Sequence, residues 1–201
     1  MILKKLHIHL SIAFVIVLGL GLLYVMLQDK FRSVNTATGE PMPAFTLETF
    51  EPLSTDPLTF SEKSLKGNVT FVVFFASWCP GCVAEHPSLS LVEARQGLLR
   101  LGVAVQDKDS SLARMLKKKG NPFDRIGADR DGQASNIWNL RGVPESFVID
   151  KEGRIRFHHS GGLTTTIIQK EILPLIDSLI AERSEGADSK KVPMSEDASA
   201  D

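Results

Sequence analysis

The sequence predicts an α/β layered domain with a mixed central β-sheet, helices on both faces of the sheet and a terminal antiparallel hairpin. Three observations predict it. The run Val69–Phe75 is continuously β-branched and aromatic, which is typical of a buried central strand. Strand-like and helix-like stretches alternate along the chain. Near the end of the domain, two strand-like runs flank residues 150–153, whose sequence Asp-Lys-Glu-Gly indicates a hairpin turn.

The other strands are expected to be short, at residues 44–47, 57–60, 101–105, 125–128, 145–149 and 154–158. A helix is expected to begin at Pro80, because proline suits the first turn of a helix, and Pro87 should kink it. A second helix is expected at 110–119. Asp109 can cap its first turn, and Gly120 follows its last turn.

The remaining elements follow the same signals. A short helix is expected at 133–140. Thr164 can cap a final amphipathic helix that reaches about Arg183, with Pro174 disturbing its middle. The tail, 184–201, is small, polar and mildly acidic, so we expect it to be disordered.

The N-terminal segment is expected to be a membrane anchor. Residues 10–27 carry no charge, and a helix of that length spans roughly 27 Å, close to a hydrocarbon core of about 30 Å. A cleaved signal peptide is the alternative, but its apolar region is usually shorter and is followed by a clear cleavage site. We therefore expect a head at 1–9, an anchor at 10–27, a tether at 28–40 and a folded domain at 41–183. Positive charges on both sides of the apolar run leave its orientation open.

Composition excludes several classes of protein. The chain has 201 residues, 43% hydrophobic and 23% charged, which is enough to bury a core in one domain. A net charge of −1 and the lack of a long basic run disfavour nucleic-acid binding. Two cysteines allow one disulfide at most, so the chain is not a disulfide-framework protein.

The two cysteines, Cys79 and Cys82, form a C-x-x-C pair where the central strand gives way to a helix. A structural zinc site needs four ligands, and this pair with His86 supplies three at most. Haem attachment needs C-x-x-C-H, but residue 83 is valine. A structural disulfide is the plain alternative, although so small a loop gains little stability. The start of a helix favours a thiolate, so a redox pair is the better interpretation, with Trp78 as an apolar surface beside it.

Over residues 41–183 the sequence resembles the thioredoxin superfamily. Within that superfamily it resembles the membrane-anchored thiol:disulfide interchange proteins of cytochrome c maturation, DsbE (also called CcmG). The resemblance rests on an ordered set of motifs: Trp78-Cys79-Pro80-x-Cys82-x-Ala84-Glu85-His86, Pro87 in the following helix, Gly142-Val143-Pro144-Glu145 with Phe147-x-Ile149-Asp150, and Gly162-Leu163-Thr164.

The resemblance implies a dithiol mechanism and a substrate site. Cys79 is expected to be the exposed attacking thiol and Cys82 the buried resolving thiol, which together form a redox-active disulfide. Pro144 is expected to be a cis-proline facing the pair. Val143 would then present its backbone to an extended substrate, beside Trp78. An ordinary proline at the start of a strand is the alternative for Pro144.

Two carboxylates are candidate proton carriers. Glu85 lies three residues after Cys82 on the same helical face, and Glu145 follows Pro144 directly. Our hypothesis is that both lie near the thiols, raise the cost of a thiolate and help to carry the proton of Cys82, which would make the protein a reductant. Exposed glutamates without a role are the alternative. His86 is expected to be solvated or helix-capping rather than catalytic.

The resemblance also implies a location and partners. The expected protein is a single-pass inner-membrane protein with its soluble domain in the periplasm, and it needs no cofactor or metal. It would reduce the C-x-x-C-H disulfide of apocytochrome c before haem attachment and draw electrons from a DsbD-like membrane carrier.

Two positions depart from the relatives' pattern, since Gly81 replaces a usual threonine and Val73 replaces the buried aspartate of cytosolic thioredoxins. A broad-specificity tethered reductase or oxidase, a thiol peroxidase and a non-enzymatic apocytochrome-binding module are the alternative functions.

Overall fold

The computed structural model describes residues 17–19, 21, 39–50 and 59–182. The predicted head and tail lie outside the described residues, as do most of the predicted anchor and tether. Residues 17–19 and 21 are helical and belong to a unit, 1–34, that is distinct from the unit containing the domain. Within the described ranges, no helix is both long enough and apolar enough to cross a membrane.

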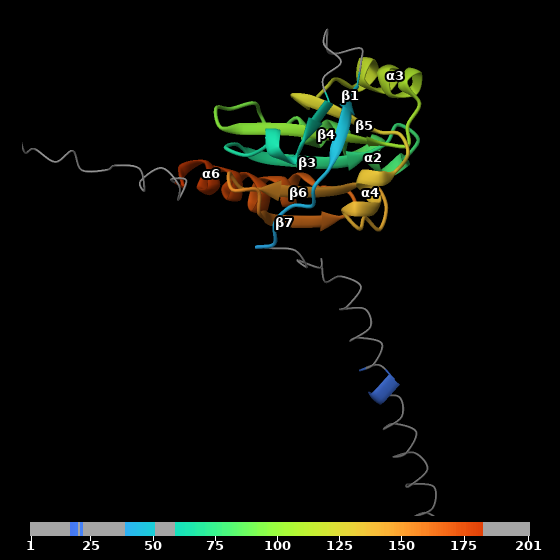
Figure 1. The fold of residues 1–201 in the computed structure, drawn as a ribbon. Coiled ribbons are helices and arrows are strands. Elements are labelled where there is room, and N and C mark those ends of the chain that lie inside the picture. Colours follow the sequence, from blue (N-terminus) through green and yellow to red (C-terminus); the bar gives the residue numbers. More distant parts are fainter. Residues whose placement is uncertain (1–16, 20, 22–38, 51–58, 183–201) are drawn as a thin grey trace, which may run out of the picture. The chain divides into compact units, whose positions relative to one another are not determined.

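The domain is built on a seven-stranded sheet with the order β2-β1-β5-β4-β3-β6-β7. Its strands are β1 (Thr46–Thr49), β2 (Thr59–Ser61), β3 (Val69–Phe75), β4 (Leu98–Val105), β5 (Arg125–Asp129), β6 (Glu145–Ile149) and β7 (Ile155–Ser160). The central strands β5, β4 and β3 are parallel, whereas the pairs on either side of them are antiparallel, so the sheet is mixed (Figure 1).

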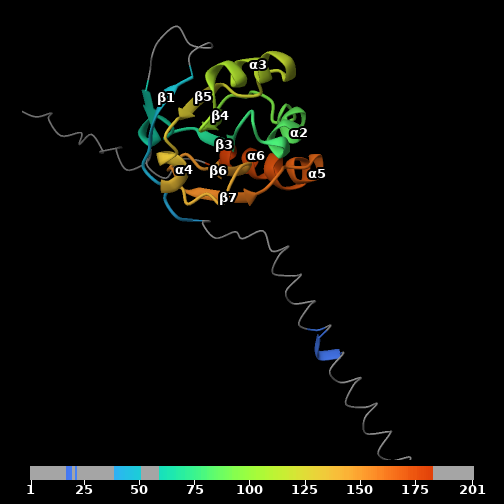
Figure 2. The same ribbon diagram turned by 90° about the vertical axis from the view of Figure 1, so that its right-hand side faces the viewer.

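Helices cover both faces of this sheet. They are the short 3₁₀ helix η1 (Glu62–Ser64), α2 (Pro80–Leu89), α3 (Asp109–Lys119), α4 (Gln133–Ile137), α5 (Thr165–Ile167), the π-helix η2 (Ile168–Ile172) and α6 (Leu173–Ala181). One hydrophobic cluster joins the sheet to α2, α3 and the α5–η2–α6 segment, and a second joins its other face to α4. Figure 2 shows α2, α5 and α6 on one side of the sheet and α4 on the other.

The central strand β3 contributes side chains to both hydrophobic clusters. All seven of its residues are buried, and successive side chains of a strand point to opposite faces. Phe71 and Phe75 therefore belong to the cluster beneath α2, whereas Val72 and Phe74 belong to the cluster beneath α4. Strand β3 thus reaches the turn that carries the two cysteines from the middle of the core, which fixes the position of the residues that follow Phe75.

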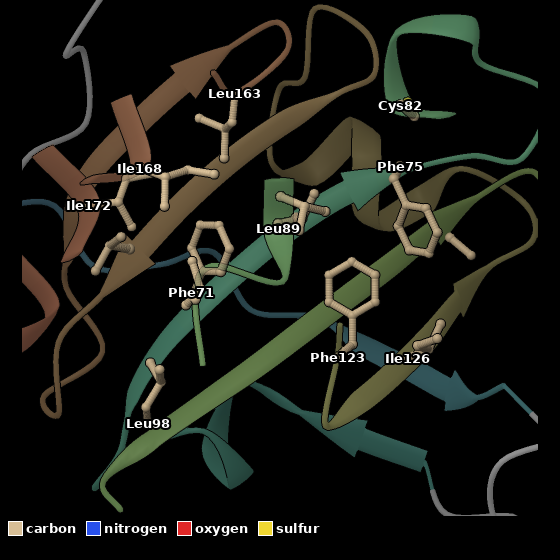
Figure 3. Close-up of a cluster of buried hydrophobic side chains, with 14 of the residues drawn as sticks. Phe71, Phe75, Cys82, Leu89, Leu98, Phe123, Ile126, Leu163, Ile168 and Ile172 are labelled. Carbon is tan, nitrogen blue, oxygen red and sulfur yellow. The ribbon is translucent and has the colours of Figure 1, made fainter. Parts of the chain in front are cut away.

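The cluster beneath α2 continues from the sheet to the last helical segment. Figure 3 shows Phe71, Phe75 and Phe123 on the sheet side, with Leu163 and Ile168 from the end of the chain. The rings of Phe75 and Phe123 have centroids 5.0 Å apart. This packing joins α2 to residues more than seventy positions later, and it brings the segment around Leu163 to that helix.

The structure confirms the predicted α/β fold and the predicted sequence of strands and helices along the domain. Strands β3 and β6 have the predicted bounds, and α2 begins at Pro80. The other strands begin and end within three residues of the predicted positions. Thr164 caps the last helical segment, because its hydroxyl accepts a hydrogen bond from the backbone N–H of Ile167 at 3.3 Å. Strands β6 and β7 form the predicted hairpin.

The predicted cap of α3 is wrong. Lys108 occupies the cap position, and no side chain there bonds the first turn of α3. Asp109 lies inside the helix instead, where its carboxylate accepts hydrogen bonds from the guanidinium of Arg130. The Asp109 carboxylate thus binds Arg130, a residue beyond β5, and does not cap the first turn of α3.

Two helix boundaries also differ from the prediction. Helix α4 ends at Ile137 rather than at 140, because Asn139 adopts a φ of 51°, in the left-handed region that stops a helix. The final helix is interrupted by the π-helix η2, which directly precedes the turn containing Pro174. Proline has no N–H to donate and its ring crowds the preceding turn, so a wider turn accommodates it.

Candidate active site

The two cysteines are joined in a disulfide at the start of α2. Cys79 is the N-terminal cap of the helix, and its sulfur accepts a hydrogen bond from the backbone N–H of Cys82 at 3.1 Å. Cys82 lies inside the first turn and is 1% exposed. Cys79 was expected to be exposed but is only 5% exposed, and the Val143–Pro144 segment lies against its sulfur.

The loop that carries Trp78 is held from the neighbouring strand. The indole Nε1 of Trp78 donates to the carbonyl oxygen of Val105 at 3.2 Å, while 58% of the side chain remains exposed. The carboxylate of Asp107 accepts hydrogen bonds from both the backbone N–H and the hydroxyl of Ser77. Trp78 therefore presents an exposed apolar face beside Cys79 from a fixed loop.

Sequence reasoning missed the Ser77–Asp107 pair. Its only signal was that both residues follow neighbouring strands, β3 and β4, which were not known to be adjacent. The structure shows that these strands are parallel, so their carboxyl ends meet at one edge of the sheet.

The segment before β6 faces the disulfide. The Val143–Pro144 peptide bond is cis, as the family resemblance implied. The carbonyl oxygen of Val143 lies 3.4 Å from the Cys79 sulfur, and the carbonyl oxygen of Pro144 accepts from the N–H of Gly161 at 2.8 Å. A side chain at Gly81 would begin 3.5 Å from the Pro144 ring, so α2 and this segment are in close contact.

Glu85 is a buried side chain of α2 that contacts Leu163 of the cluster beneath this helix. It is 5% exposed and lies one turn after Cys82 in the helix. Its Oε2 atom accepts a hydrogen bond from the backbone N–H of Leu163 at 2.6 Å, whereas its buried Oε1 atom has no hydrogen-bond partner among the described residues. Burial raises the pKa of Glu85 to about 7, and the Leu163 hydrogen bond opposes this shift. The carboxyl group can therefore gain and lose a proton near neutral pH.

Glu145 has a different environment from Glu85. Its side chain follows the alternation of β6 that places Phe147 and Ile149 in the cluster beneath α4, on the face opposite α2. Its Oε1 atom accepts from the N–H of Arg141 at 2.7 Å, and its Oε2 atom lies 2.8 Å from His158 Nε2. The structure thus places the two predicted carboxylates on opposite faces of the sheet.

The pKa of Glu145 moves in the direction opposite to that of Glu85. Burial would raise this pKa, but the hydrogen bonds from His158 and from the Arg141 backbone, together with the His158 charge, lower it below its ordinary value. Glu145 therefore stays ionised at neutral pH, whereas Glu85 can exchange a proton there.

His86 was expected to be solvated or helix-capping, and the first alternative is wrong, since the residue is 1% exposed. Its Nε2 atom lies 2.9 Å from the carbonyl oxygen of Gly120, so it binds the end of α3 rather than its own helix. Burial lowers the pKa of His86, and its ring lies beside Phe75 and Phe123. These contacts indicate a structural role between α2 and α3.

Comparison with known proteins identifies the family. The Redoxin family model matches residues 37–172. The thiol:disulfide interchange protein DsbE of Yersinia pestis is 38% identical over 149 residues, which cover 74% of this chain and 77% of the relative. The thiol:disulfide interchange protein HelX of Rhodobacter capsulatus is 36% identical over 155 residues, which cover 76% of this chain and 85% of the relative.

Solved structures agree with the observed fold. The crystal structure of a thiol:disulfide interchange protein of the thioredoxin family from Chlorobium tepidum matches with a TM-score of 0.55 and 27% identity, over 72% of this chain and 97% of that one. The C-x-x-C pair at the start of α2 lies inside the region that the Redoxin family model matches. The chain therefore belongs to the Redoxin family and, within it, to the DsbE-type thiol:disulfide interchange proteins, as an oxidoreductase with its cysteine pair at Cys79 and Cys82.

Proposed function

We propose that this oxidoreductase is a reductant, anchored in the inner membrane with its domain in the periplasm, that reduces the C-x-x-C-H disulfide of apocytochrome c before haem attachment. The observation that carries the proposal is the buried Glu85 carboxyl, with a pKa of about 7, one turn from Cys82. The motif resemblance to cytochrome c maturation proteins supports the client, and the uncharged run at 10–27 supports the anchor.

The first step is attack by Cys79 in the reduced enzyme. Its thiolate attacks one sulfur of the substrate disulfide, the substrate S–S bond breaks, and a mixed disulfide forms while the other substrate sulfur leaves as a thiolate. The helix N-terminus and the Cys82 N–H favour a thiolate at Cys79. An extended substrate would lie along the Val143–Pro144 backbone, against the exposed face of Trp78.

The second step is resolution by Cys82. Glu85 accepts the Cys82 proton, and the new thiolate attacks the Cys79 sulfur. The mixed disulfide breaks, the second substrate thiol is released, and the Cys79–Cys82 disulfide forms, so two electrons have passed to the substrate. A carboxyl with a pKa of about 7 is suited to this transfer at neutral pH.

The environment of the thiols favours reduction of the substrate. A buried carboxylate one turn after Cys82 raises the free energy of the Cys82 thiolate, so the reduced enzyme gains less from ionisation of its thiols and is a stronger electron donor. We assign the proton of Cys82 to Glu85 rather than to Glu145, because Glu145 is held ionised on the other face of the sheet. A DsbD-like membrane carrier would return two electrons to the Cys79–Cys82 disulfide after each cycle.

The proposal is tested by trapping the substrate. We would express full-length Cys82→Ala in its native host, because without Cys82 the mixed disulfide on Cys79 cannot be resolved. The expected partners are C-x-x-C-H polypeptides and a reducing membrane carrier. A catch of many unrelated periplasmic proteins would instead indicate a broad-specificity enzyme.

Two matched variants complete this experiment. Cys79→Ser together with Cys82→Ala should trap nothing, because the attacking sulfur is absent. Cys79→Ser alone should abolish cytochrome c maturation in the host. If it supported maturation at the normal level, the protein would be a binding module and the proposed redox function would be wrong.

A further inference from the structure

We propose that His158 is a positioning residue for this reaction: through Glu145, it holds the segment from Arg141 to Pro144 that faces the Cys79 sulfur. The proposal rests on the substrate-binding role given to that segment in the proposed function. It assigns no contact between His158 and the substrate, and it concerns peptide binding rather than thiol chemistry.

The Glu145 carboxylate connects β7 to the segment before β6. Its side chain is 2% exposed, and His158, the Arg141 backbone and the Ser160 hydroxyl all hydrogen-bond its carboxylate. Oε2 lies 2.8 Å from His158 Nε2, and Oε1 accepts from the backbone N–H of Arg141 at 2.7 Å. Because water has almost no access to this carboxylate, losing the His158 bond leaves it with the Ser160 hydroxyl and the Arg141 N–H only, at a cost in free energy.

The His158 ring is itself held in place. It stacks on Phe147, with centroids 4.4 Å apart and planes tilted by 2°, and the two residues face each other across the β6–β7 pair. The hydroxyl of Ser160 lies 3.5 Å from the same Nε2 atom. The stacked ring can therefore present Nε2 to Glu145 in one fixed direction.

The chain of contacts ends at the redox pair. Arg141 lies two residues before Val143, whose carbonyl oxygen is 3.4 Å from the Cys79 sulfur. A second attachment, from the Gly161 N–H to the Pro144 carbonyl oxygen, holds the other end of the segment. Without His158, the Glu145 carboxylate loses its nearest side-chain partner and can turn away from the Arg141 N–H, so the backbone before Val143 is held less firmly.

The experiment compares two amide substitutions in the full-length reduced protein. A glutamine amide can occupy the place of the histidine Nε2 atom, whereas an asparagine amide reaches only the place of Nδ1. Both variants lose the stacked ring, so they differ mainly in their ability to reach Glu145. We would measure KM and kcat for a peptide that contains a C-x-x-C-H disulfide, and the rate with the small substrate 2-hydroxyethyl disulfide, with a dithiol in excess that returns two electrons to the Cys79–Cys82 disulfide after each turnover and with its direct reaction with the substrate subtracted.

We expect His158→Asn to raise KM for the peptide by about tenfold, because a hydrogen bond to a buried charge is lost. The kcat for the peptide, the rate with 2-hydroxyethyl disulfide and the reduction potential should stay at the wild-type values. His158→Gln should return KM close to the wild-type value. His159→Asn is the matched control, since His159 is the next residue along β7 and its ring lies beside Phe157 instead.

Two results would overturn the proposal: equal KM values for His158→Asn and His158→Gln, or an equal loss with the peptide and with 2-hydroxyethyl disulfide. The same measurements on a disulfide peptide of unrelated sequence distinguish failure of the His158 proposal from failure of the apocytochrome proposal. If the wild type reduces both peptides equally, the apocytochrome proposal fails, yet His158→Asn should still raise KM for both. Denaturant unfolding of each variant shows that only folded protein is compared.

Discussion

At the scale of single residues, Glu85 links the active site to the stability of the domain. Its pKa is raised from an ordinary value of 4.5 to about 7 because the carboxyl group is buried. Between these two values the folded chain holds a proton that the unfolded chain has lost. The free energy of unfolding must therefore fall as the pH rises through this window, by up to about 3 kcal/mol at 1.36 kcal/mol per pKa unit.

We predict that Glu85→Gln removes this pH dependence. The amide keeps an oxygen that can accept the Leu163 N–H, but it cannot ionise. Denaturant unfolding at pH 5 and pH 8 should show a loss of stability for the wild type and a much smaller one for the variant. Glu93→Gln, at an exposed position after α2, is the control and should keep the wild-type loss. Equal losses in Glu85→Gln and the wild type would contradict the raised pKa.

The two carboxylates should also affect the thiols unequally. Above pH 7, Glu85→Gln removes a buried negative charge from the helix of Cys82, so we expect lower thiol pKa values and a less reducing potential. Glu145→Gln should change both quantities less, because Glu145 lies on the opposite face of the sheet. Alkylation rates of the reduced protein against pH, and equilibration with glutathione, measure the two effects. No change in either variant would remove both carboxylates from the thiol chemistry.

At the scale of elements, two glycines differ in whether the structure has room for a side chain at their position. Gly81 lies in the first turn of α2, where an added Cβ would sit 3.5 Å from the Pro144 ring and 3.9 Å from the Cys79 sulfur, both ordinary contacts. Gly102 lies in β4, where an added Cβ would sit 2.7 Å from the Phe123 ring. The first site has room for a side chain and the second does not.

We therefore expect Gly81→Ala to stabilise the domain by about 0.5–1 kcal/mol, because alanine is the better helix former. Gly102→Ala should destabilise it by about 1–3 kcal/mol through overpacking. Denaturant midpoints of the two oxidised variants measure both effects. A loss of stability in Gly81→Ala would show that the active-site turn needs a glycine, and a neutral Gly102→Ala would show that the Phe123 ring can move aside.

Boundaries of elements were predicted least well, for reasons visible in particular residues. Asp109 had the sequence of a helix cap, but Arg130 binds its carboxylate from a loop 21 residues later. The final helix was predicted as one element interrupted by Pro174, yet the sequence could not show that the preceding turn widens into η2. In both cases the boundary depends on contacts or backbone geometry that the neighbouring residues in the sequence do not show.

At the scale of the whole molecule, the sequence predicted what local motifs encode. The β3 strand, the Pro80 start of α2 and the C-x-x-C pair each depend on a few adjacent residues, and the structure has them as expected. The surroundings of the site depend on contacts between distant segments, such as Glu85 with Leu163 and Ser77 with Asp107. Such contacts depend on strand order and register, which no short stretch of sequence contains.

Because the cysteine pair is part of the folded domain, its redox state and the free energy of unfolding must depend on each other. If folding stabilises the Cys79–Cys82 disulfide over the dithiol, the protein is a reductant, with a potential nearer about −270 mV than about −120 mV. By linkage, the oxidised domain must then resist denaturant better than the reduced domain. Unfolding both forms at pH 7 measures this difference, and a variant with alanine at both cysteines should not respond to the added reductant. A reduced form as stable as the oxidised form would mean that the fold favours neither state, and the proposed direction of electron flow would have to be abandoned.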